Sequence, residues 1–408
     1  MSVSIRNIID ISLIIIFYAG FQGGKYFLNN RMQELGFAIT ISLFIYCAIR
    51  LAHSQIKIKW AWWFWSAPMF ILYLMISASV SFSLLADTAI APSFFGTREF
   101  LIIILTPTIY FIYKLGYEIE RLERIFVISL IIIVLNYLFH YFRLDLPSTY
   151  FSSGYTSYLV TYDEWRGYRL KPPLIALVII TLFTGFRICQ NDGLLKNIFL
   201  IILACIIGYI WYLVKARSQM ATIVLAVFIY PIFFSRPRRI NLFILVAPLI
   251  LLSIIALGSA LVDKFMTAEG SEVRAHSYNI AFEGIHERPF FGHGQSSAYS
   301  KTYQDLYGKK FFPTDLGIVG ITFKYGLIGA FIYLFFNFYI FHRLMRVNWY
   351  YRHINKRHNL VIWSLLVLSI AITINLLLNP VLAMMQGLTF ASFAIGLTAC
   401  YHDKYKDL

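Results

Sequence analysis

The sequence predicts an all-α integral membrane protein with about twelve transmembrane helices. It is 59% hydrophobic and only 13% charged, which is more apolar than a soluble chain of 408 residues requires. Apolar runs long enough to cross a bilayer recur from end to end. No alternating strand pattern appears, and backbone in lipid must satisfy its own hydrogen bonds, so we expect these runs to be helices. No soluble module interrupts them, so residues 1–408 are predicted to form a single multi-span membrane domain.

The apolar runs give the predicted helices in order. The first follows Arg6 and lacks a cleavage site of small residues, so it is predicted to be a retained span and not a signal peptide. The last two runs are separated by Asn379 and Pro380, which mark either a loop or a kink. The predicted spans are 8–24, 34–49, 60–85, 100–115, 125–142, 172–188, 198–214, 220–235, 240–262, 316–341, 361–378 and 380–400.

The net charge of +15 is spread over the loops and not over a folded soluble domain, so nucleic acid is not an expected partner. Lys and Arg concentrate in alternate short loops, and this bias places both termini in the cytoplasm. The two long loops, 143–171 and 263–315, then lie on the outer side. The four cysteines show no CxxC spacing and the histidines no metal-ligand spacing, so we expect no disulfide framework, no metal site and no cofactor.

The large outer loop contains the most informative segment of the chain. Arg274, Tyr278, Ala281 and Ile285 recur at helical spacing, which predicts a short amphipathic helix over about 272–287. Proline disfavours helix just before it, so the helix should end ahead of Pro289. The sequence Gly292, His293, Gly294 then predicts a flexible turn where backbone approaches a ligand closely. An arginine on an interfacial helix is equally explained as a surface residue.

Three more polar residues lie at positions that favour function. Arg217 lies in a tight outer turn, where it either extends to the head groups or binds phosphate as a bidentate fork. Lys324 lies nine residues after Asp315, inside a predicted span, where a cation normally faces the bundle interior or a carboxylate. Asp315 is either a general base or the N-cap of that span.

Three motifs in this half of the chain resemble those of the O-antigen ligase and polymerase superfamily. The first is Arg274, Tyr278 and Ala281 followed by Pro289-Phe-Phe-Gly292-His-Gly294. The second is Ala216-Arg217-Ser218, and the third is Tyr325-Gly326-Leu-Ile-Gly329. Their order and topology also resemble the family over about residues 200–345. In the ligases a histidine stands eleven residues before the glycine of the third motif, where this chain has Asp315.

The resemblance implies a metal-independent glycosyltransferase of the bacterial inner membrane, with a donor glycan on undecaprenyl diphosphate. Arg217 and Arg274 match the functional arginines of the family and would stabilise the diphosphate leaving group. The missing histidine favours a polymerase of O-antigen, capsule or exopolysaccharide units, with a ligase that transfers glycan to lipid A core or another acceptor as the alternative. Contacts to the glycan are expected from Arg166, Tyr168 and Arg169 of the first outer loop, with Tyr278, Gly292, His293, Gly294 and Lys324 also assigned to substrate binding.

A lipid-linked oligosaccharide flippase is the alternative from another class. Such a transporter should show two related halves and short loops. This sequence has no detectable halves and concentrates its polar residues in the two outer loops. Membrane lipids, the lipid-linked oligosaccharide and a chain-length regulator protein are the expected partners.

Overall fold

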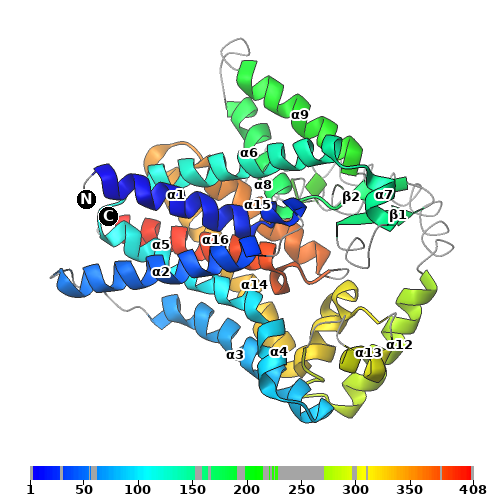
Figure 1. Ribbon diagram of the computed structural model, residues 1–408. Coiled ribbons are helices and arrows are strands. Elements are labelled where there is room, and N and C mark those ends of the chain that lie inside the picture. The colour runs from blue at the N-terminus through cyan, green and yellow to red at the C-terminus, as the bar shows by residue number, and fades with distance from the viewer. Residues whose placement is uncertain are drawn as a thin grey trace, which may run out of the picture.

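The computed structural model describes residues 3–27, 31–54, 56, 62–151, 159–163, 167–190, 198–214, 220, 223–224, 226–227, 271–295, 301–308, 311–376 and 379–405. Nearly all of these residues lie in helices (Figure 1). The elements are α1 (Val3–Gly20), η1 (Gly23–Phe27), α2 (Arg31–His53), α3 (Trp62–Ala86), α4 (Ile90–Gly96), η2 (Arg98–Ile104), α5 (Leu105–Lys114), α6 (Ile119–Arg143), α7 (Leu146–Phe151), β1 (Val160–Asp163), β2 (Gly167–Leu170), α8 (Leu174–Gln190), α9 (Ile198–Val214), α12 (Ser271–Glu287), α13 (Lys301–Tyr307), η5 (Pro313–Asp315), α14 (Gly317–Asn355), α15 (Leu360–Asn375), η6 (Val381–Ala383) and α16 (Met385–Lys404).

The helices confirm an all-α membrane protein. Within the described part of the chain, five helices are long and apolar enough to cross a bilayer: α1, α2, α3 from Pro68 onward, α6 and α14. The apolar helices α8, α9 and α15 are shorter. Ten of the twelve predicted spans coincide with described helices, whereas 220–235 and 240–262 lie almost wholly outside the described residues. The count of twelve therefore stays a prediction.

Both termini lie at one end of the bundle, and β1, β2 and α7 lie at the other (Figure 1). Ion pairs cross-link the helices at the terminal end, where Lys404 Nζ lies 2.8 Å from a Glu120 carboxylate oxygen. The other pairs there are Lys114 with Asp403, Arg121 with Asp10, and Arg6 with Glu118. These pairs are partly exposed, so each contributes at most about 1 kcal/mol to stability. Together they connect α1, α5, α6 and α16 at this end of the bundle.

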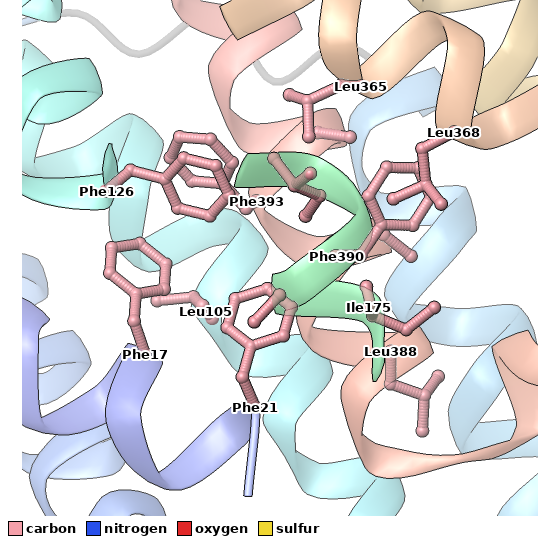
Figure 2. Close-up of a cluster of buried hydrophobic side chains, with 14 of the residues drawn as sticks. Phe17, Phe21, Leu105, Phe126, Ile175, Leu365, Leu368, Leu388, Phe390 and Phe393 are labelled. Atoms are coloured by element: carbon pink, nitrogen blue, oxygen red, sulfur yellow. The ribbon is translucent and has the colours of Figure 1, made fainter. Parts of the chain in front are cut away.

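The core forms where α16 passes through the middle of the bundle. Figure 2 shows Phe393 of α16 stacked on Phe126 of α6, with Phe17 of α1 against their edges. The Phe126 and Phe393 ring centroids are 3.8 Å apart. Nearly every residue of α16 from Met385 to Tyr401 is buried, as expected for a helix that is apolar on all sides. This helix fixes the positions of the others around it.

The C-terminal helices are broken at two places. α14 is interrupted at Gly326, whose φ of 68° and ψ of −175° are not helical. The second break lies between α15 and α16, where Pro380 and the short turn η6 separate two distinct helices. The sequence left Asn379 and Pro380 open between a kink and a loop; the structure shows a loop.

A small β-hairpin corrects the purely helical expectation. β1 and β2 pair antiparallel within the first outer loop, with Thr161 opposite Arg169 and Tyr162 opposite Tyr168. The strands are four residues each. They are rich in β-branched and aromatic residues, which favour a pleated surface. Gly167 at the start of β2 has a φ of +68°, a conformation that suits a hairpin turn.

Candidate active site

The glycine-rich turn of the large outer loop docks onto the break in α14. The break leaves backbone groups of α14 without helical partners, and residues 289–294 pair with them. His293 N donates to Phe323 O at 2.8 Å, Gly294 N to Lys324 O at 2.8 Å, and Leu327 N to Pro289 O at 2.7 Å. The first and third motifs are therefore two halves of one backbone joint, which fixes α12 against α14.

The glycines of this joint allow backbone to approach backbone. A Cβ on Gly292 would lie 2.5 Å from Gly326 N, and one on Gly294 would lie 2.3 Å from Ala78 O and Phe82 N. Both glycines have positive φ angles. The expectation that this turn approaches a ligand is thus corrected: in the structure its backbone packs against α3 and α14.

Gly294→Ala should destabilise the protein strongly, because the new methyl group collides with the backbone of α3 in a left-handed conformation. We expect a loss of at least about 2 kcal/mol, seen as a lower unfolding temperature in detergent. Gly116→Ala is the matched control, since Gly116 also has a positive φ but has open space around its Cβ position. Equal unfolding temperatures for the two variants would contradict the joint.

His293 is part of the same joint and not an open ligand contact. It is 4% exposed, and its ring stacks on Phe323 with centroids 4.7 Å apart. Nε2 lies 2.8 Å from Gly284 O and Nδ1 lies 3.1 Å from the Tyr307 hydroxyl. Burial lowers the pKa of His293 below its ordinary value. A neutral histidine with both ring nitrogens engaged holds α12 and α13 together, which is not the substrate-binding role that the sequence suggested.

The amphipathic helix of the outer loop forms as predicted, as α12. It ends at Glu287, ahead of Pro289. Ala281 is fully buried, and Tyr278 and Ile285 are partly buried with it against Phe82 and Phe323. The apolar stripe therefore packs on other parts of the protein. Arg274 lies in the first turn of α12, one helical turn before Tyr278; its side chain lies outside the described residues.

Asp315 and Lys324 lie within electrostatic range of each other, although nine residues separate them. Lys324 is 6% exposed and also interacts with the Glu99 carboxylate. Glu99 accepts a hydrogen bond of 3.1 Å from Met385 N at the start of α16. Buried lysine is costly without a counter-charge, so these carboxylates explain how Lys324 is tolerated inside the bundle. Asp315 itself is exposed.

Leu316, and not Asp315, occupies the N-cap position of α14, and the Leu316 side chain makes no capping hydrogen bond. Asp315 ends the short turn η5, one residue earlier. Asp315 therefore belongs to the turn before α14 and not to the helix itself.

The first outer loop contributes further basic residues to the surroundings of Asp315. Lys171 follows β2, and burial lowers the pKa of its ammonium group while the Asp315 carboxylate opposes that shift. Arg169 lies close to Lys171 and donates from Nη1 to Val214 O at 3.3 Å, at the end of α9. Arg217 follows Val214 by three residues and, like Arg166, lies outside the described residues. The structure thus brings together Asp315, Lys324, Lys171 and Arg169 from distant parts of the sequence.

Tyr168 belongs to an aromatic cluster beside these charges. Its ring centroid is 4.6 Å from that of Tyr162 and 5.5 Å from that of Tyr150. Tyr162 and Phe151 are exposed at 47% and 74%. The hairpin and α7 therefore present aromatic side chains at the end of the bundle opposite the termini, next to Arg169.

The part of the chain that carries the three motifs was compared with known families. Residues 198–334 match the family model described as O-antigen ligase. This segment of the chain is similar to O-antigen ligases. This confirms the resemblance to the O-antigen ligase and polymerase superfamily. No curated protein matches the chain.

The matched segment runs from α9 into α14 and includes Arg217, Arg274, Asp315 and Lys324. Together with the apolar helices, it supports a multi-pass membrane protein that transfers lipid-linked glycans. Lys171, Arg169 and Glu99 lie outside the matched segment. Nothing in the sequence marks Lys171 or Glu99, because only the fold places Lys171 near Asp315 and Glu99 near Lys324.

Proposed function

We propose that the protein polymerises undecaprenyl-diphosphate-linked oligosaccharide repeat units on the outer face of the bacterial inner membrane, with both termini in the cytoplasm. The observation that carries the proposal is the position of Asp315. It is exposed, interacts electrostatically with Lys171 and Lys324, and lies within the segment that matches the O-antigen ligase family model. A carboxylate beside an excess of cations is suited to a transfer that releases an anion.

The reaction transfers the growing glycan from its diphosphate to a hydroxyl of the next unit. The hydroxyl oxygen forms a bond to the anomeric carbon of the donor, and the bond from that carbon to the diphosphate oxygen breaks. The electron pair of the broken bond leaves with undecaprenyl diphosphate. Asp315 takes the proton of the attacking hydroxyl and acts as the general base.

Cations stabilise the charge that develops on the leaving diphosphate. Arginine is suited to this because its planar fork binds two phosphate oxygens at once. Arg217 and Arg274 are assigned this role from their match to the family motifs. Arg169 supports the assignment of Arg217, because its contact with Val214 joins the first outer loop to the end of α9.

The aromatic surface on the hairpin is assigned to the glycan. Aromatic rings pack against the apolar faces of sugars, and polar groups at their edges fix orientation. Tyr168, with Arg169 and Arg166 at the same loop, supplies that combination. Tyr278, which is partly buried in the apolar stripe of α12, is also assigned to substrate binding.

A ligase that transfers finished glycan to lipid A core or another acceptor is the second candidate, favoured by the description of the matched family. Deletion of the gene separates the two. A polymerase deletion should leave single repeat units attached to the final acceptor, and the wild-type gene should restore the long chains. A deletion strain that accumulates full-length lipid-linked polymer with nothing attached would contradict the proposal and indicate a ligase. Unflipped units on the cytoplasmic side would instead indicate a transporter.

A further inference from the structure

A buried lysine from the N-terminal part of the chain lies next to this site. Lys25 of η1 is 9% exposed. Its Nζ donates to Pro172 O at 3.2 Å and lies 5.2 Å from the centre of the Tyr26 ring. An ammonium group has three donors. Among the described residues, Pro172 is its one hydrogen-bond partner and no carboxylate pairs with it.

Hydrogen bonds among η1, α6 and the end of β2 hold Lys25 in this place. The Tyr26 hydroxyl donates to Lys171 O at 2.8 Å, and Asn136 of α6 donates to Gly23 O at 3.0 Å. The Tyr137 hydroxyl, also on α6, donates to Leu170 O at 3.3 Å. These bonds join η1 to the segment after β2, so the fold holds Lys25 in a fixed position.

The charged group that faces Lys25 is another cation, Lys171. Like charges repel, and the burial of Lys25 together with this repulsion lowers the pKa of Lys25 to about 7. Asp315 interacts with Lys171, but Arg169 is also near. The four groups carry more positive than negative charge. The titratable rings around Tyr26, on α1 and α6, are those of Tyr18, Tyr137 and His140.

We propose that Lys25 and Lys171 form an oxyanion-binding pair that holds the leaving diphosphate of the lipid-linked donor beside Asp315. The inference rests on the proposed function and extends the site beyond the matched family segment. The bond to the acceptor oxygen forms at the same carbon that loses the diphosphate. The group that deprotonates the acceptor and the leaving phosphate must therefore lie close together, and Lys171 already interacts with Asp315.

The test is binding of farnesyl diphosphate, a short isoprenyl diphosphate without sugar, to the purified full-length protein in detergent. Lys25→Met and Lys171→Met should each weaken binding about tenfold, because each removes one charge-assisted contact to phosphate. Lys171→Arg should keep the affinity within a few fold. Arg143→Met is the matched control, since Arg143 is an exposed cation at the outer end of α6, and it should leave binding within about twofold.

A second readout distinguishes binding from a general effect on the fold. An oxyanion favours the charged form of Lys25, so binding at pH 8 should take up protons from the buffer. Calorimetry in buffers of different ionisation enthalpy measures this uptake, which Lys25→Met should remove. Lys171 is only partly buried, so Lys171→Met tests the pair even where Lys25→Met does not fold.

Wild-type affinity in both methionine variants, or losses no larger than in Arg143→Met, would overturn the pair. Lysine-dependent binding of glucuronic acid in place of the diphosphate would also overturn it, because the site would then take an acidic sugar. Binding is measured without turnover. A protein that binds the diphosphate through these lysines but makes no polymer would refute the proposed function and leave the pair standing.

Discussion

Arg217→Ala and Arg274→Ala should each reduce glycan transfer by at least about 100-fold, the usual cost of removing one group that stabilises an oxyanion. Each change removes a bidentate contact to the diphosphate as its charge develops. Conversion of radiolabelled lipid-linked repeat units by the purified protein measures the rate. Expression and the unfolding temperature should stay at wild-type values, since the loss is one of chemistry and not of folding.

Two lysine substitutions and one control variant complete this experiment. Arg217→Lys and Arg274→Lys should retain part of the rate, because lysine keeps the charge but not the planar fork. Arg98→Ala is the control, since Arg98 is a partly exposed outer residue that pairs only loosely with Glu34 at 3.8 Å. Normal polymer from both alanine variants would refute the role of these arginines in diphosphate binding.

Asp315→Asn should slow transfer by roughly 10²- to 10⁴-fold, the range that general base catalysis contributes. Asparagine has the same shape but cannot accept the proton of the acceptor hydroxyl. Asp315 is exposed and lies outside the N-cap position of α14, so the unfolding temperature should change little. Removal of a negative charge from among cations should leave diphosphate affinity unchanged or tighter.

This variant is informative because the transfer rate should fall while the diphosphate affinity stays unchanged or becomes tighter. Rates are measured with labelled repeat units, and affinity is measured with farnesyl diphosphate on the same preparation. A slow rate with intact affinity separates the base from the anion site. A wild-type rate in Asp315→Asn would show that another group removes the proton, and the assignment of Asp315 would fall.

The sequence predicted those features that depend on neighbouring residues. The extent of α12 followed from its apolar spacing and Pro289, and Lys324 was recognised because a cation within a span must be explained. The turn at 289–294 was also recognised, but its partner was not. Glycines permit a close approach of two backbone segments, but the sequence does not identify the second segment. The break in α14 shows that the turn packs on the backbone of that helix.

The remaining features depend on contacts between distant segments. Lys25, Glu99 and Lys171 are unremarkable in the sequence. Packing brings Lys171 near Asp315 and Lys25, and it brings Glu99 near Lys324. The short hairpin was missed because each strand has only four residues. Strands of that length give too few alternations to be distinguished from a loop.

Reconstitution with one substrate tests the central claim most directly. The purified protein is placed in liposomes that contain lipid-linked repeat units as the sole glycan, with no lipid A core or other acceptor. A polymerase should convert the single units into a ladder of longer lipid-linked chains, and Asp315→Asn should leave them as single units. If the wild-type protein leaves the units unchanged, and transfers them only after lipid A core is added, the chain is a ligase and the account given for it is wrong.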